Sequence, residues 1–137
     1  MKKNNSFKNI LIVFGLIILV AVAYQFYNKI QPGQLDTFAQ CLSDKGAKFY
    51  GAFWCPHCQA QKALFGNSKN KLPYIECSTP DGNGQVDICK QKGITAYPSW
   101  SFPIASTTST STEETISGER TLKELSEKTG CALPEGY

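Results

Sequence analysis

The chain has 137 residues, with 14 Lys and Arg, 11 Asp and Glu, one histidine and six cysteines, and its formal net charge is +3. Four of the basic residues precede residue 31, so residues 31–137 carry 10 basic against 11 acidic residues. A nearly neutral remainder argues against nucleic-acid binding, and the sequence has no glycine-rich phosphate loop for a nucleotide or flavin. We therefore expect neither nucleic-acid partners nor a cofactor.

The N-terminus has the pattern of a targeting segment. Lys2, Lys3 and Lys8 precede or flank an apolar stretch at 10–27, and no acidic residue occurs before position 36. A basic flank followed by an apolar core predicts a signal peptide or an uncleaved signal-anchor. The 18 residues of the stretch are at the low end of what spans a bilayer.

We predict that residues 1–30 are a retained membrane anchor with its lysines in the cytoplasm, and that residues 31–137 are an exported domain. The alternative is cleavage after Ala23, at the site Ala21-Val22-Ala23, and secretion. Six cysteines in so short an exported chain fit an oxidising compartment, where disulfides persist.

The exported part alternates helical and strand patterns. Its helices are predicted from apolar residues at helical spacing, and Gly46, Gly66, Gly93 and Gly130 are placed to end them. Thr121 and Glu124 have capping-box spacing. The Ser/Thr-rich stretch 106–112 is predicted to be a solvated hairpin loop. In chain order we expect a linker at 31–33, a helix at 35–45, a strand at 47–53, a helix at 55–65, a strand at 73–77, a turn at 81–84, a short helix around 86–89, strands at 98–104 and 115–117, and a helix from 121.

The motif Cys55-Pro56-His57-Cys58 lies between an expected strand and an expected helix, the arrangement of a redox dithiol. Cys55 would lie at the helix N-terminus, where the helix dipole stabilises a thiolate. Pro56 suits the first helical position. A protonated His57 would further favour the thiolate, the attacking form in thiol–disulfide exchange.

Two other interpretations of the same motif are a metal site and an inert disulfide. Cys77 and Cys89 could add two sulfurs to Cys55 and Cys58, but the sequence has no second CxxC and no finger-like Cys/His pair. A disulfide across two residues closes too short a loop to stabilise much. We therefore predict redox chemistry and no bound metal.

Several stretches resemble a known family. Residues 54–58 look like the active site of the thioredoxin superfamily, and residues 93–98 resemble the loop that carries its cis-proline. More narrowly, the stretches 50–59, 74–77 and 93–100 look like the thioredoxin-like domain associated with vitamin K epoxide reductase-type membrane proteins. The resemblance covers about residues 35–131. It implies a trimmed thioredoxin-like α/β fold, with a central mixed sheet of about four strands flanked by helices, after the N-terminal anchor.

The resemblance also implies roles for individual residues. Cys55 is expected to be the nucleophile that forms mixed disulfides, and Cys58 the buried resolving cysteine. Pro98 is expected to follow a cis peptide bond beside the dithiol, and Tyr97 to present backbone groups to an extended substrate. Trp54 is expected to flank the substrate surface, or else to pack beside the sheet.

One position departs from the family pattern. Many thioredoxins carry a buried carboxylate six residues before the first active cysteine, where it helps to accept a proton from the second. Phe49 occupies that position here. A proton relay to Cys58 through a buried acid at this place is therefore not expected.

The remaining four cysteines allow three pairings. We choose Cys41 with Cys131, which would join the first helix to the end of the last. We also pair Cys77, at the end of a strand, with Cys89 in the next helix. A second electron-carrying pair at these last two residues is the functional alternative.

The function we predict is that of an extracytoplasmic, membrane-anchored thiol–disulfide oxidoreductase. The Pro56-His57 dipeptide resembles that of strongly oxidising bacterial members of the family, which favours an oxidant. Such an oxidant would pass electrons from substrate protein thiols to a quinone-linked membrane partner, for example one of the vitamin K epoxide reductase type. The alternatives are a reductase or isomerase of the same fold, and a copper- or zinc-binding module using Cys55, His57 and Cys58.

Overall fold

The structure is a computed structural model that describes residues 5–104 and 113–137. The predicted hairpin loop at 106–112 therefore lies outside the described residues. The chain divides into two units, Met1–Pro32 and Gly33–Tyr137. This division falls close to the boundary that the sequence analysis places after residue 30.

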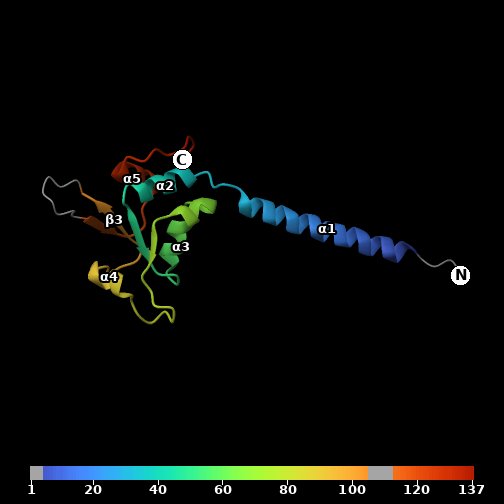
Figure 1. Ribbon diagram of the computed structural model, residues 1–137, viewed down its shortest axis with the longest axis horizontal. Helices are drawn as coiled ribbons and strands as arrows, with labels where there is room; N and C mark the ends of the chain where they lie inside the picture. The colour runs from blue at the N-terminus through green and yellow to red at the C-terminus, as the bar shows by residue number, and fades with distance from the viewer. Residues whose placement is uncertain (1–4, 105–112) are drawn as a thin grey trace. The chain divides into compact units, whose positions relative to one another are not determined.

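The first unit contains one long helix, α1 (Asn5–Ile30) (Figure 1). Within it, Phe7–Tyr27 is a stretch of 21 residues with a mean hydropathy of 2.5 and with none of its most apolar part buried. At about 1.5 Å rise per residue such a stretch is long enough for the bilayer core. By length and composition alone, α1 is a candidate membrane anchor or signal sequence.

The second unit is built around a four-stranded sheet in the order β2-β1-β3-β4. The strand β1 (Lys48–Gly51) runs parallel to β2 (Tyr74–Glu76) and antiparallel to β3 (Ser99–Pro103). The edge strand β4 (Glu113–Ser117) is antiparallel to β3. The sheet is therefore mixed, and the parallel pair β1–β2 requires the helical crossover that carries the dithiol.

The helices of this unit are α2 (Asp36–Asp44), α3 (Pro56–Ala63), α4 (Asp87–Gln91) and α5 (Leu122–Thr129) (Figure 1). The mixed sheet and its flanking helices confirm the predicted trimmed thioredoxin-like fold. The sequence interpretation missed the 3₁₀ helix η1 (Gly66–Lys71), which follows α3. η1 begins at Gly66, which has a φ of +50°, a left-handed conformation that favours glycine.

The central strands carry the largest side chains of the core. Phe49 stacks on Trp100 at 4.8 Å between ring centroids, and both side chains are completely buried. Phe38 of α2 stacks on Phe65 at 6.0 Å. Phe49 is thus packed between aromatic neighbours, an environment that would penalise an unpaired carboxylate at this position.

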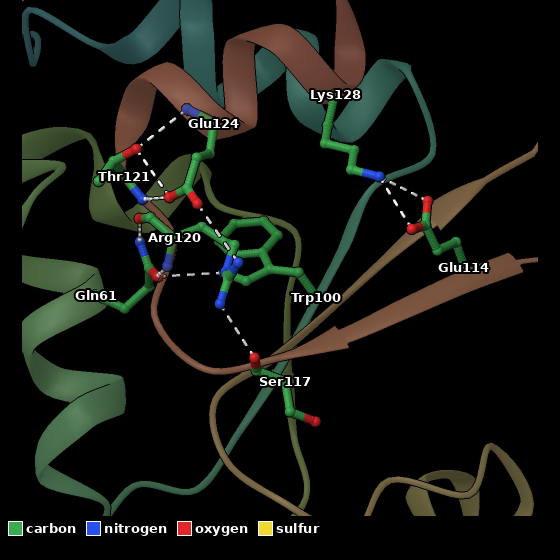
Figure 2. A network of polar contacts seen from close by, with 8 residues as sticks. All are labelled: Gln61, Trp100, Glu114, Ser117, Arg120, Thr121, Glu124 and Lys128. Atoms are coloured by element: carbon green, nitrogen blue, oxygen red, sulfur yellow. Dashed lines mark hydrogen bonds and ion pairs between the residues drawn. The ribbon is translucent and has the colours of Figure 1, made fainter.

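The last helix is fixed at both ends by the local signals that predicted it. Thr121 and Glu124 form a complete capping box, and Gly130 ends α5 with a left-handed φ of 72°. Ion pairing between Lys128 and Glu114, at 2.8 Å, joins α5 to β4 (Figure 2). The caps therefore set where α5 begins and ends, and the ion pair holds the helix against β4.

In the structure, disulfides join Cys41 to Cys131 and Cys77 to Cys89. The first links α2 to the segment after α5 and closes a sequence separation of 90 residues. The second links the end of β2 to α4 over 12 residues, and both of its sulfur-bearing residues are fully buried. These two bonds leave Cys55 and Cys58 as the free thiols among the described residues.

Candidate active site

The two free thiols lie at the N-terminal end of α3. Cys55 is the N-cap residue, with an extended backbone (φ −78°, ψ 119°), and Pro56 begins the helix. The backbone N–H of Cys55 donates to the carbonyl of Ala52 at 3.0 Å, while its own carbonyl accepts from Gln59 at 3.1 Å. The strand-to-helix turn thus places the Cys55 sulfur at a helix start, where a thiolate is stabilised.

The two sulfurs differ in their access to solvent. Cys55 is 5% exposed, whereas Cys58 is completely buried. Burial raises the pKa of the Cys58 thiol to about 12, and interactions with the Cys55 side chain act in the same direction. Two interactions oppose this rise: a hydrogen bond with the backbone of Ala52 and the charge of Lys62 both lower the pKa of Cys58. Both residues are therefore buried, with slight exposure left only at Cys55, and burial holds Cys58 as a thiol.

The loop before β3 faces the dithiol. The peptide bond between Tyr97 and Pro98 is cis. The Cys55 thiol lies 3.7 Å from the carbonyl oxygen of Tyr97, within contact distance for a sulfur donor. The hydroxyl of Tyr97 accepts a hydrogen bond of 2.7 Å from the amide of Gln85, which also donates to the carbonyl of Ile94. Two side-chain contacts from Gln85 thus hold this loop beside Cys55.

An apolar rim borders the dithiol on the side of the turn. Phe53 and Trp54 are 48% and 53% exposed, so two large apolar side chains that precede Cys55 face solvent. The indole N–H of Trp54 donates to the hydroxyl of Ser78 at 2.9 Å, and its ring meets Tyr97 edge-on at 6.2 Å. Trp54 is thus anchored at one edge while remaining about half exposed.

His57 lies on the exposed side of α3. Its Nδ1 lies 2.6 Å from a carboxylate oxygen of Glu119, a residue that precedes α5. The side chains are 70% and 40% exposed, so this pair is screened by water. No local pattern of residues indicated this pairing, because the two residues are 62 positions apart.

A buried glutamine ties the active-site helix to the rest of the domain (Figure 2). The side-chain oxygen of Gln61 accepts from the backbone N–H of Arg120 at 2.7 Å and from the indole N–H of Trp100 at 3.3 Å. Its side-chain nitrogen donates to the carbonyl of Arg120 at 2.9 Å. Sequence reasoning missed Gln61, whose only hint was a polar residue on the inner face of an expected helix.

Three further side chains gather near Cys58 from α3 and β2. Tyr74 approaches the same point above Gly51 as the Cys58 sulfur, Lys62 lies over the Tyr74 ring, and Glu76 accepts a hydrogen bond from the Tyr74 hydroxyl; no role was predicted for Lys62 from the sequence. Among residues 5–104 and 113–137, no group of three or more His, Cys, Asp or Glu side chains is arranged to hold a metal ion.

The chain is similar to a protein that is named for its activity. It is 38% identical over 102 residues to "Thiol-disulfide oxidoreductase LTO1" of Arabidopsis thaliana, a match that covers 71% of this chain and 24% of the relative. The chain thus spans about a quarter of the length of that protein. No family model matches the chain.

The fold, the site and the similarity to the Arabidopsis protein all agree with one kind of chemistry. The domain has a thioredoxin-like fold whose free dithiol lies at a helix N-terminus, beside the loop of Tyr97 and Pro98. The Arabidopsis relative carries the name of a thiol–disulfide oxidoreductase. These observations support a thiol–disulfide redox function.

Proposed function

We propose that the protein is a thiol–disulfide oxidoreductase whose reactive pair is Cys55 and Cys58. The observation that carries this proposal is the asymmetry of the pair. Cys55 caps α3 and lies beside the Tyr97 carbonyl, whereas Cys58 is fully buried one turn further along. A partner sulfur can approach the first thiol, and the second is placed to displace it.

The reaction in the oxidising direction has two exchange steps. A substrate thiolate attacks the Cys55 sulfur of the Cys55–Cys58 disulfide, so a mixed disulfide forms and Cys58 leaves with the electron pair as a thiolate. A second substrate thiolate then attacks the substrate sulfur of the mixed disulfide, and Cys55 leaves as a thiolate. The substrate is oxidised by two electrons and the protein dithiol is reduced.

Recognition of the substrate would use the surface around Cys55. We assign to Trp54 the apolar flank of this surface, and to Tyr97 and Pro98 the backbone groups that face an extended substrate chain. Pro56 and His57, between the two cysteines, would tune the reduction potential. The half-exposed ring of Trp54 and the contact of Cys55 with Tyr97 support this assignment.

Membrane attachment is the second part of the proposal. Residues 1–30 would anchor the chain by the apolar stretch of α1, and residues 31–137 would act outside the cytoplasm. The length and hydropathy of Phe7–Tyr27 support an anchor. Disulfides at Cys41–Cys131 and Cys77–Cys89 support an oxidising compartment.

The direction that we propose is oxidation of substrate protein thiols, with electrons passed to a quinone-linked membrane partner of the vitamin K epoxide reductase type. The Pro56-His57 dipeptide and the resemblance of this domain to those associated with such partners favour this direction. A reductase would use the same dithiol with electrons flowing the other way, and an isomerase would use it with no net electron flow. The reduction potential separates a reductase from an oxidant or an isomerase.

Trapping of the mixed disulfide tests the assignment of the two cysteines. In the full-length chain, the Cys55 thiolate of Cys58→Ser should attack a disulfide-containing peptide, release one peptide sulfur as a thiolate and accumulate as a mixed disulfide, because no resolving sulfur remains. Cys55→Ser should form none. Each variant is the control for the other, since both remove one sulfur of the same pair. Equal trapping by both variants, or by neither, would contradict the proposal.

The reduction potential tests the direction. Full-length protein in detergent would be equilibrated against glutathione buffers, and the redox state read by mass spectrometry. An oxidant or isomerase is expected at about −120 to −200 mV, and a reductant at about −270 mV. A value near the latter would overturn the oxidising direction without affecting the oxidoreductase assignment.

A further inference from the structure

The buried thiol of Cys58 must act as a thiolate in the proposed reaction, and burial opposes that state. Cys58 is completely buried. Phe49, on β1, occupies the position at which a carboxylate could have accepted the proton of Cys58. Another group near Cys58 must therefore stabilise negative charge on this sulfur. This inference rests on the proposed thiol–disulfide exchange.

The ring of Tyr74 approaches the same point as the Cys58 sulfur. A Cβ atom built on Gly51 would lie 2.9 Å from Sγ of Cys58 and 2.8 Å from Cε2 of Tyr74. Gly51 is on β1 and Tyr74 on the parallel strand β2, so the missing side chain of Gly51 leaves the space that both groups fill. The thiol and the ring thus converge on one small space over the sheet.

A lysine covers this ring. Lys62 follows Cys58 by four residues on α3, so the two side chains share one face of the helix. The ammonium nitrogen of Lys62 lies 3.3 Å from the centroid of the Tyr74 ring, a cation–π contact. Lys62 is therefore held next to the ring that faces the Cys58 sulfur.

A fixed carboxylate supports the arrangement from the other side. The hydroxyl of Tyr74 donates to one oxygen of Glu76 at 2.7 Å. The other oxygen accepts from the backbone N–H of Ser78 at 2.9 Å and of Phe53 at 3.2 Å. Both oxygens of Glu76 are thus engaged, and its charge is fixed at the end of β2.

The electrostatics agree with this geometry. Burial lowers the pKa of Lys62, while the charges of Glu76 and Cys58 raise it and that of Lys69 lowers it. Burial also raises the pKa of Tyr74, and the hydrogen bond to Glu76 adds to that effect, so the phenol stays neutral. The charge of Lys62 acts to lower the pKa of Cys58. Among these groups Lys62 is the cation that favours a thiolate at Cys58.

We propose that Lys62, held over the Tyr74 ring by the contact with that ring and by the charge of Glu76, is the positioning residue that stabilises the Cys58 thiolate. When a thiolate attacks Cys55 of the disulfide, the electron pair of the broken S–S bond goes to Cys58, next to this cation. In the reverse step Cys58 loses its proton to the buffer and attacks Cys55 Sγ, and the partner leaves as a thiolate. A lower thiol pKa speeds departure of the sulfur.

The test separates the two sulfurs by kinetics. Reduced full-length protein in detergent is mixed with oxidised glutathione, quenched in acid and analysed by mass spectrometry over about pH 6 to 9. The first step joins glutathione to Cys55, and the second step is attack by Cys58, which releases the glutathione. For Lys62→Met, we expect the first rate to stay within about twofold and the second to fall about tenfold throughout this pH range, because a rise of about one unit in the pKa of Cys58 lowers its thiolate fraction about tenfold.

Three variants keep the result interpretable. Lys62→Arg retains the charge and should restore the second rate. Lys123→Met removes a lysine from the exposed face of α5 and should leave both rates unchanged. Glu76→Gln removes the charge that holds Lys62 and should slow only the second step. If Lys62→Met does not fold, Lys62→Gln takes its place.

The outcomes are distinct. A second step that is unchanged in Lys62→Met, or slow and unrestored in Lys62→Arg, would overturn the role of this lysine while leaving the exchange reaction intact. Failure of the unaltered protein to form any adduct with glutathione would instead overturn the proposed function. A slower second step in Lys62→Met that Lys62→Arg restores would support the inference, because the charge of the side chain would not by itself repair a merely structural defect.

Discussion

The ring of Tyr74 and the sulfur of Cys58 meet over Gly51, the residue of β1 that has no side chain to separate them. The packing of the active-site helix against the sheet therefore depends on a glycine outside the CxxC motif. This glycine has no left-handed backbone angle, so close approach is the reason for its presence.

We predict that Gly51→Ala destabilises the protein and displaces Cys58. The new methyl group would lie under 3.0 Å from both the sulfur and the ring, and overpacking of this kind costs about 1–3 kcal/mol. Urea unfolding would measure the loss, and the rate of the Cys58 step would fall as well. Gly84→Ala is the control, because its nearest contact is the side chain of Thr79 in an exposed loop. Equal stability of the two variants would contradict the prediction.

We predict that Gln61→Leu lowers the free energy of unfolding by about 1–3 kcal/mol, because it removes the partners of buried polar groups. The backbone N–H and C=O of Arg120 and the indole N–H of Trp100 would lose their bonds to this side chain. Denaturant unfolding followed by tryptophan fluorescence would measure the change in the free energy of unfolding. The exposed Gln91→Leu is the control and should stay within about 0.5 kcal/mol. A change in Gln61→Leu as small as that of the control would show that the network contributes little.

The two disulfides should differ in their contribution to stability. In the chain-entropy treatment, a bond that closes 90 residues contributes about 4.6 kcal/mol, and one that closes 12 residues about 3 kcal/mol. We predict that Cys41→Ala/Cys131→Ala loses more than Cys77→Ala/Cys89→Ala when unfolding is measured in urea. The reverse order would show that packing around the buried Cys77–Cys89 bond outweighs loop length.

A carboxylate at the sheet edge should make stability depend on pH. The hydrogen bond from Lys48 lowers the pKa of Glu113 to about 2 from its ordinary 4.5, and bonds from Lys92 and Ser101 act in the same direction. Because the folded pKa lies below the unfolded one, the stabilisation is complete above about pH 4.5 and is lost as the pH falls towards about 2.

We therefore predict that Glu113→Gln destabilises the protein at pH 7 by up to about 1 kcal/mol, the size expected of partly exposed ion pairs. The difference from the unaltered protein should shrink as the pH falls below 4.5. Urea unfolding at a series of pH values would measure it. Glu127→Gln, on the exposed face of α5, is the control and should show a smaller difference at every pH. A difference that does not change with pH would mean that Glu113 acts through packing.

The order of the elements was predictable from local patterns. The capping box of α5, the glycines that end the helices and the alternation of strands and helices are all set by residues a few positions apart, and the structure confirms them. The position of the dithiol at a helix start was predictable for the same reason. The 3₁₀ helix η1 was not, because its polar sequence has no apolar periodicity.

The sequence by itself thus determined the CxxC motif at the head of α3 and the apolar N-terminal helix, since each depends on spacing along the chain, and its resemblance to the thioredoxin superfamily indicated the fold class. Only the tertiary structure decided that His57 meets Glu119, that Gln61 holds Arg120, and that Lys62 lies over Tyr74. These contacts join residues that are 12 to 62 positions apart. Their geometry depends on how the helices cross the sheet, which no local pattern of residues specifies.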